Sequence, residues 1–145
     1  MAQEREEREL GRLIIVLQWL HVLFGVFWFG SQMYSVMSVR PTLDRLPRES
    51  AAMMDKALGE GTPRRITVIS SSGTVLLGIL RGLAGGVLDV LDTAYGRTWL
   101  AALGIGTFMV VSIWTRGFGG RIHIILWNGL FLVMFTLMIA MRFGY

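Results

Sequence analysis

Four long stretches of the chain are apolar and nearly free of charge: about 12–39, 64–85, 96–116 and 122–142. A helix of roughly 20 residues crosses the hydrocarbon core of a bilayer, so each stretch is long enough to span it once. The links between them are short. We therefore predict an all-α integral membrane protein, an up-down-up-down four-helix transmembrane bundle that forms a single domain. Both termini should then lie on the same side of the membrane.

The first apolar stretch has one polar face. When the residues are projected at about 100° each, the polar and small side chains fall on a single stripe, and the other faces are aliphatic or aromatic. The stripe consists of Gln18, His21, Gly25, Trp28, Gln32 and Ser35. We expect this stripe to point into the protein and the remainder of the helix to face lipid. An ionisable side chain inside a span marks a functional site by default, which makes His21 the leading candidate.

The boundaries of the first span follow from local signals. Pro41 predicts that the helix ends at Arg40, because the residue before a proline disfavours the helical conformation. The charged residues 2–12 contain glutamate and arginine at helical spacing. They could extend the helix into water, but charged chain ends are commonly disordered, and we predict a frayed tail here.

The later links also carry signals. Residues 50–58 have the pattern of a short amphipathic helix, which we expect at the membrane surface. Thr62 and Pro63 are typical of an N-cap and a first helical residue, and predict the start of the second span. Residues 85–95 could hold a brief turn. Within the second span, a ridge of small residues predicts the close approach of a neighbouring helix: Ser70, Thr74, Gly78 and Gly82.

Composition supports the membrane assignment. Hydrophobic residues make up 53% of the chain and the mean hydropathy is +0.56. The net charge of +4 comes from residues that flank the spans and are not grouped on one soluble face, so we expect a lipid bilayer as partner and no nucleic acid. The chain has no cysteine, which excludes disulfides and thiolate metal sites. Eight of the 14 basic residues lie on the side of the 40–65 link, which weakly favours a cytoplasmic position for that link.

Few reactive groups lie inside the spans. No aspartate or glutamate is placed there, which argues against a proton-coupled carrier. The two histidines should be about 15 Å or more apart along the membrane normal, given the rise of a helix, so one haem is not expected to bridge them. Serines 70–72 have no base nearby and are interpreted as helix-packing residues.

Three roles remain open for His21. In the first, it binds haem b or a metal together with a methionine of the fourth span: Met134, Met138 or Met141. Gln18 could then hydrogen-bond to a ligand or a propionate, and Arg81 and Arg97 could pair with haem propionates. In the second, His21 only packs, with its nitrogens bonded to a neighbouring helix. In the third, it meets a second copy of the chain in a homo-oligomer.

The other histidine opens the fourth span at the opposite surface. We interpret His123 mainly as a polar end-group, with a second metal site formed with Met33 or Met37 as the alternative. Trp28 lies deep on the His21 stripe, where it could stack on a flat cofactor or pack in the core.

Two short segments resemble known bacterial membrane proteins. The segment Trp19-Leu20-His21-Val22-Leu23, followed by Val26-Phe27-Trp28-Phe29-Gly30, resembles the first span of a group that includes the copper-resistance protein D (CopD) domain and the HemJ-type protoporphyrinogen oxidases. The ending Met138-Ile139-Ala140-Met141-Arg142-Phe143-Gly144 resembles the closing span of the copper-resistance type.

The resemblance implies a bacterial inner-membrane protein in which His21 is the haem or metal histidine and its partner is a methionine or histidine of another span. HemJ-type proteins also carry a basic residue important for activity, for which Arg40 and Arg81 are the nearby candidates. Copper-resistance D proteins generally have more than four spans.

The leading hypothesis is a His21-centred site that holds haem b or copper, for electron transfer or metal handling. If the protein is an enzyme, we expect a membrane oxidoreductase. The alternative is a small membrane subunit or assembly factor without chemistry of its own, whose small-residue ridges bind helices of a larger complex. A third hypothesis, a small-solute transporter, would need a polar stripe on more than one span, and only the first span has a clear one.

Overall fold

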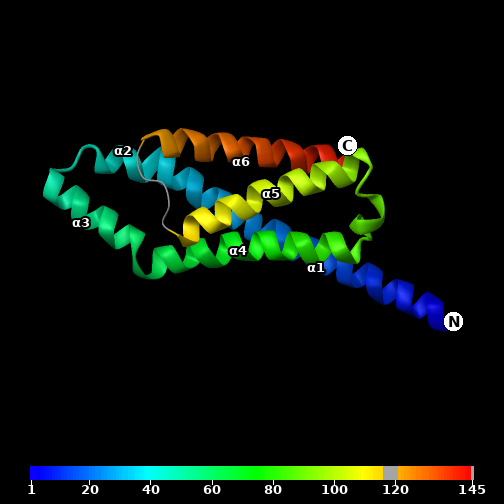
Figure 1. Cartoon of the computed structure of the whole chain (residues 1–145). Coiled ribbons are helices and arrows are strands. Elements are labelled where there is room, and N and C mark those ends of the chain that lie inside the picture. The colour runs from blue at the N-terminus through cyan, green and yellow to red at the C-terminus, as the bar shows by residue number, and fades with distance from the viewer. Residues whose placement is uncertain (116–120, 145) are drawn as a thin grey trace.

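The computed structural model describes residues 1–115 and 121–144, except for the side chains of residues 2 and 121–124. Four long helices run alternately in opposite directions, and both termini lie at the same end of the bundle (Figure 1). The long helices are α1 (Ala2–Tyr34), α4 (Gly61–Ala84), α5 (Ala94–Trp114) and α6 (Arg121–Arg142). The predicted all-α, up-down-up-down bundle is confirmed, and the described residues contain no strand.

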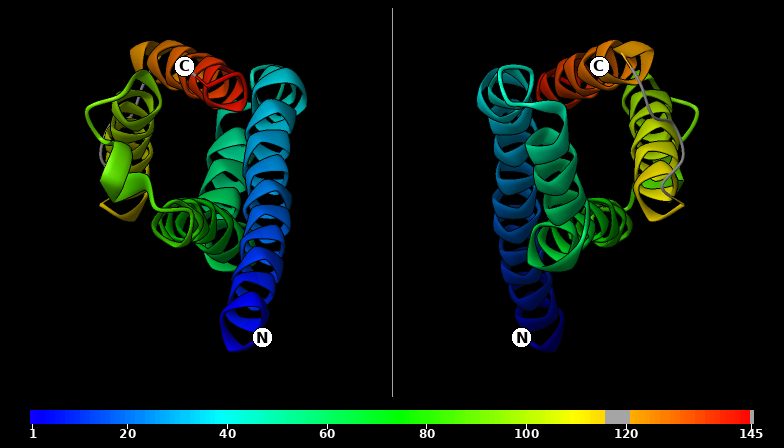
Figure 2. Two further views of the ribbon diagram at one scale, coloured as in Figure 1. Left: turned by 90° about the vertical axis from the view of Figure 1, so that its right-hand side faces the viewer. Right: turned by 90° about the vertical axis from the view of Figure 1, so that its left-hand side faces the viewer.

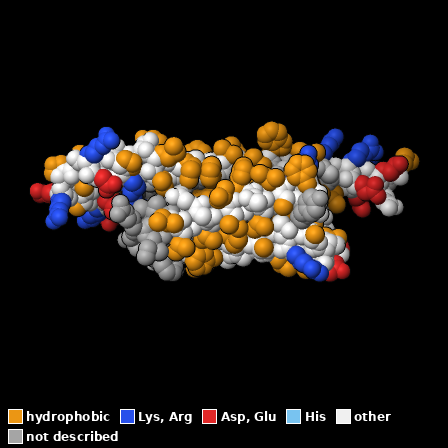
Figure 3. Space-filling model, turned by 90° about the horizontal axis from the view of Figure 1, so that it is seen from above, with side chains coloured by type: hydrophobic (Ala, Val, Ile, Leu, Met, Phe, Trp, Pro, Cys, Tyr) orange, Lys and Arg blue, Asp and Glu red, His pale blue; other side chains and the backbone are white. Residues whose placement is uncertain are grey.

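The outside of the bundle is suited to lipid. Four helical segments of the described chain are long and apolar enough to cross a membrane: Gln3–Leu43, Gly61–Ala84, Ala94–Trp114 and Ile125–Arg142. Large apolar side chains such as Leu23, Phe27 and Phe135 are more than half exposed along them. Hydrophobic side chains cover the middle of the molecule, and charged side chains gather at its two ends (Figure 3). By helix length and composition, the chain is a multi-pass membrane protein.

The first helix is longer than predicted at its start. The frayed tail predicted for residues 2–12 is wrong, because α1 is helical from Ala2 onward. The charged side chains support this turn locally: the Arg8 guanidinium donates through Nε to the Glu4 carbonyl oxygen at 3.1 Å. Arg8 thus bonds to the residue four positions earlier, as its spacing suggested, but to the backbone carbonyl of Glu4 and not to its carboxylate.

The predicted end of the first span at Arg40 is also wrong. After α1 the chain continues as a π-helical turn, η1 (Ser35–Val39), and then as α2 (Arg40–Leu43). The Arg40 amide donates to the Ser35 carbonyl, five residues back. Pro41 therefore falls in the first turn of a new helical segment, where its missing N–H costs no hydrogen bond, and the wider π turn makes room for its ring.

The links hold two short helices. The amphipathic helix predicted at 50–58 is present as α3 (Arg48–Gly59). The second span begins earlier than Thr62, because Glu60 is the N-cap and Gly61, at φ +66°, starts α4 in a conformation that favours glycine. The turn expected in 85–95 is the 3₁₀ helix η2 (Val87–Val90), after which the Thr93 hydroxyl accepts from the Gly96 amide and caps α5.

The core lies in the middle of the bundle. Trp28 of α1 packs edge-on against Phe131 of α6, with ring centroids 4.9 Å apart, and Met109 and Trp127 complete this cluster. Viewed along the bundle, α1 and α4 lie side by side, and α5 and α6 complete a ring (Figure 2). The predicted small-residue ridge of α4 lies at these contacts, since Ser70, Thr74 and Gly82 are buried. The core therefore closes the ring at mid-height, and a separate space lies between it and the end that carries the termini.

Candidate functional site

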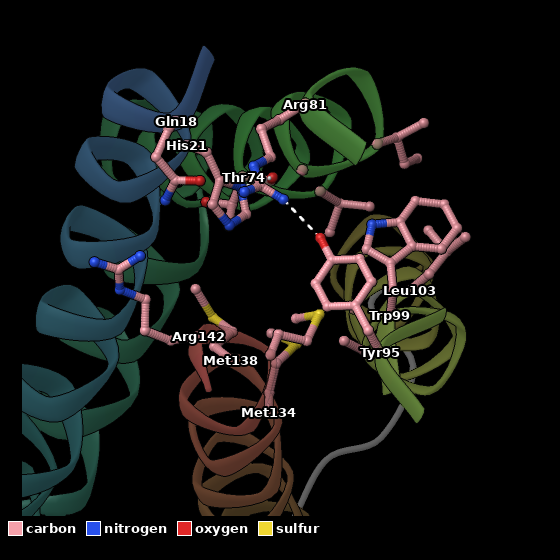
Figure 4. Close-up of a pocket in the computed structure, with 16 residues that line it drawn as sticks. Gln18, His21, Thr74, Arg81, Tyr95, Trp99, Leu103, Met134, Met138 and Arg142 are labelled. Atoms are coloured by element: carbon pink, nitrogen blue, oxygen red, sulfur yellow. Dashed lines mark hydrogen bonds between the residues drawn. The ribbon is translucent and has the colours of Figure 1, made fainter. Parts of the chain in front are cut away.

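A cavity of about 510 Å³ lies between the four long helices. It opens towards the end of the bundle that carries the termini, because Arg142 ends α6 and Tyr95 belongs to the first turn of α5. Each long helix supplies lining side chains, as Figure 4 shows. The residues used below are Gln18, His21, Thr74, Gly78, Arg81, Tyr95, Trp99, Leu103, Met134, Met138 and Arg142.

The His21 ring is held in one orientation by the backbone of α4. Its Nδ1 lies 2.8 Å from the carbonyl oxygen of Thr74. A carbonyl oxygen only accepts, so Nδ1 of the neutral ring carries the proton and Nε2 keeps its lone pair. A histidine that donates one N–H to a backbone carbonyl and leaves the other nitrogen free has the arrangement commonly found in metal-binding histidines.

Glycine at position 78 lets the ring reach this carbonyl. A Cβ at Gly78 would lie 2.9 Å from His21 Cε1 and 3.1 Å from Nδ1. Gly82, the next residue of the ridge, makes room for a side chain of α5 in the same way, because a Cβ there would lie 2.6 Å from Nε1 of Trp99. The ridge that the sequence predicted as a helix-packing feature therefore also shapes the wall of the cavity.

The methionines of α6 face His21 across the cavity. Trp28 touches Phe131, and α1 and α6 are antiparallel, so moving seven residues along each helix from this contact leads to His21 and to Met138. Seven residues are close to two helical turns, so His21 lies on the same face of α1 as Trp28, and Met138 lies on the same face of α6 as Phe131. Met138 is therefore at the level of His21, and Met134 lies about 6 Å deeper, one turn away. Figure 4 shows both side chains directed into the cavity.

Cationic groups lie at the open end. A guanidinium N–H of Arg81 donates to the hydroxyl of Tyr95 at 2.7 Å, whereas the Nε atom of Arg81 is buried and has no hydrogen-bond partner among the described residues. Arg142 stands at the mouth, near Gln18 (Figure 4). The described side chains that line the cavity include no aspartate or glutamate. The polar end of the cavity is therefore suited to an anion.

Most of the residues predicted for the His21 site do come together. Gln18, His21, Arg81, Met134 and Met138 all line the cavity.

Trp28 is not among them. It is only 2% exposed and packs against Phe131 in the core, so the structure assigns it to packing and not to a cofactor wall. Arg97, proposed together with Arg81 as a partner of propionates, is exposed and does not line the cavity.

The second predicted metal site lies at the other end of the bundle. Met33 is twelve residues after His21, or about 18 Å along α1, so these two side chains cannot hold one ion. The side chain of His123 is outside the described residues, and its pairing with Met33 or Met37 stays a prediction. Arg40 also belongs to that end, where it pairs with Asp55 at 3.4 Å.

Tyr95, Trp99 and Arg142 were not predicted for the site. Tyr95 was assigned to a link, Trp99 was given no role in the site, and Arg142 was interpreted as the end of the fourth span. The spacing of Tyr95, Trp99 and Leu103 places them on one face of α5, which is the signal that could have grouped them.

The donor set limits the metals that can bind. Among the described residues, no three His, Cys, Asp or Glu side chains gather in one place. The strong metal ligand in the cavity is the free nitrogen of His21, with the methionine sulfurs opposite it.

The predicted packing role of the serines agrees with the structure, since the hydroxyls of Ser70 and Ser71 donate to carbonyls of their own helix.

Comparison of the chain with protein-family models, with curated proteins and with solved structures gave no match.

Proposed function

We propose that the cavity binds haem b, which His21 and Met138 would hold, and that the protein transfers electrons in a bacterial inner membrane. The observation that carries the proposal is the hydrogen bond from His21 Nδ1 to the Thr74 carbonyl. It fixes the ring, and it leaves Nε2 free in a cavity with methionine sulfur opposite. The resemblance of the first and last spans to the copper-resistance D and HemJ-type proteins points to the same histidine.

The size of the cavity favours haem over a bare metal ion. About 510 Å³ is within the range of roughly 300–1,000 Å³ that pockets for small molecules and cofactors occupy. A copper ion would take the nitrogen of His21 and the soft methionine sulfurs as ligands. Copper is therefore the alternative occupant of the same site.

Each lining group has a role in this proposal. His21 and Met138 would hold the group, and Gly78 provides the space that the ring of His21 requires. Trp99, Leu103 and Met134 form apolar walls that exclude water. Arg81 and Arg142, at the open end, would pair with the carboxylates of the group. Haem b would supply a one-electron couple whose potential depends on these ligands and on burial.

The test is a pair of histidine variants. We expect His21→Ala to lose the haem absorbance of the purified protein, while its helical circular dichroism and its size-exclusion profile stay unchanged. His123→Ala is the matched control, because it lies fifteen residues from Met138, or about 22 Å along α6, and we expect it to retain the haem. A His21→Ala protein that keeps its full haem content contradicts the proposal.

Metal analysis of the same samples separates the alternatives. If the wild-type protein contains copper and has no haem absorbance, and His21→Ala has lost the copper, the result contradicts haem binding and supports metal handling at His21. A wild-type protein that is stable, colourless and free of metal after growth with added haem contradicts both, and leaves His21 as a packing residue of a membrane subunit.

A further inference from the structure

The open end of the cavity contains positive charge that no acidic side chain among the described lining residues neutralises. Arg81 is three residues before the end of α4, and Arg142 is the last residue of α6. The described lining residues supply no carboxylate, and the side chain of Arg81 is bonded to a neutral hydroxyl instead. A guanidinium that is partly withdrawn from water and lacks an anionic partner is costly, so such a group usually marks the place of a charged ligand.

The bonding of Arg81 is incomplete in a specific way. One terminal N–H donates to Tyr95 at 2.7 Å, and Nε is buried with no hydrogen-bond partner in the described part of the chain. Because the Tyr95 hydroxyl accepts from Arg81, its own proton is free to donate elsewhere. Figure 4 shows the tyrosine ring on the α5 side of the cavity, with its hydroxyl directed towards Arg81. The pair therefore offers two kinds of donor at one place.

We propose that Arg81, Tyr95 and Arg142 form a carboxylate-binding subsite for a ligand whose apolar body lies deeper in the cavity. Arg81 and Arg142 provide the charge, and the Tyr95 hydroxyl, polarised by Arg81, donates to a carboxylate oxygen. The apolar body lies against Trp99, Leu103 and Met134. This subsite lies one turn beyond the histidine towards the open end, because Arg81 follows Gly78, which the ring of His21 approaches closely, by three residues of α4.

Two molecules carry this chemistry in a membrane: the propionates of haem and the carboxylate of a free fatty acid. If the ligand is haem, the inference rests on the proposed function and assigns the contacts of its charged edge. If the ligand is a fatty acid, the subsite stands without haem. The experiment is therefore arranged so that the two sources give different results.

The first arm compares ferric haem with haem dimethyl ester, which keeps the iron and removes the negative charges. We expect the wild-type protein in detergent micelles to bind the ester about 10- to 100-fold more weakly, as for the loss of charge-assisted hydrogen bonds. We expect Arg81→Gln to weaken haem binding by a similar factor and to leave the affinity for the ester nearly unchanged. That non-additivity identifies a direct interaction between Arg81 and the carboxylates.

Two further variants control for structural effects. Arg97→Gln removes a neighbouring charge that is exposed and outside the cavity, and we expect it to bind haem as the wild type does. Tyr95→Phe keeps the ring and removes only the hydroxyl, and we expect a weaker version of the Arg81→Gln effect. The helical circular dichroism and the size-exclusion profile of each variant establish that it is folded.

The second arm measures the binding of a fluorescent long-chain fatty acid. Binding that falls in Arg81→Gln but not in His21→Ala or Arg97→Gln, in a protein that does not bind haem, supports the carboxylate subsite and contradicts the haem proposal. Equal affinities of haem and its dimethyl ester, together with fatty-acid binding that does not depend on Arg81, overturn the subsite even if His21 proves to be a haem ligand.

Discussion

Replacing Gly78 by alanine tests the contact that positions His21. An added Cβ would lie 2.9 Å from the ring carbon Cε1, whereas ordinary contact begins at 3.4 Å, so the ring must move by at least about 0.5 Å. A movement of that size away from α4 would lengthen the 2.8 Å hydrogen bond between Nδ1 and the Thr74 carbonyl to about 3.3 Å, outside the usual range for N–H···O. The substitution is therefore a small change aimed at one hydrogen bond.

The energetic effect has two opposing parts. Alanine stabilises a helix interior by about 1 kcal/mol relative to glycine. Loss of the hydrogen bond costs about 0.5–1.5 kcal/mol, and forcing a methyl group into a filled space costs roughly 1–3 kcal/mol. Gly104→Ala is the matched control, because nothing lies within 4 Å of its added Cβ and only the favourable part applies. We expect Gly78→Ala to be less stable than Gly104→Ala by roughly 2–4 kcal/mol.

Unfolding in mixed micelles, followed by tryptophan fluorescence as the denaturing detergent increases, measures this difference. Haem affinity provides a second readout, since a displaced ring moves Nε2 away from its ligand position. We expect the haem affinity to fall in Gly78→Ala and not in Gly104→Ala. Equal stabilities and equal haem affinities for the two variants would refute the close approach of α1 and α4 at His21.

Three further predictions follow from other contacts. Gly73→Ala should lower the midpoint of thermal unfolding, because its Cβ would overlap the ring of Phe24, and a second substitution, Phe24→Leu, should restore part of the loss in the same assay. Met138→Leu should change the stability by less than about 1.5 kcal/mol, since the volume is kept, but it should alter the optical spectrum of bound haem; an unchanged spectrum would exclude this sulfur as a ligand. Tyr95→Phe should destabilise the protein by about 1 kcal/mol in detergent unfolding, because it removes the acceptor of a half-buried Arg81 donor, and a neutral result would contradict that hydrogen bond.

The arrangement of spans was predictable because it depends on long-range patterns of hydrophobicity. The polar stripe of α1 was equally visible, since a helical period places Gln18 and His21 on one face whatever the neighbours are, and both line the cavity. The association of His21 with methionines of the fourth span followed from counting residues in an antiparallel bundle. These features need no knowledge of side-chain contacts.

Local features were harder to predict. Pro41 is a strong stop signal, yet a π turn before it lets the helix continue to Leu43, and such a turn has no clear sequence pattern. The role of Gly78 depends on which helix packs against the ridge, which the sequence left open. Tyr95 lines the cavity because α5 begins at Ala94, whereas the predicted third span began at about residue 96 and left Tyr95 in the link.

The most direct test of the His21 site is an oxidised-minus-reduced optical spectrum of the purified wild-type protein, with elemental analysis of the same sample. The proposal predicts a Soret band with sharp reduced α and β bands and close to one iron per chain. A stable protein without these bands and without iron, after expression with sufficient haem, would contradict the central claim.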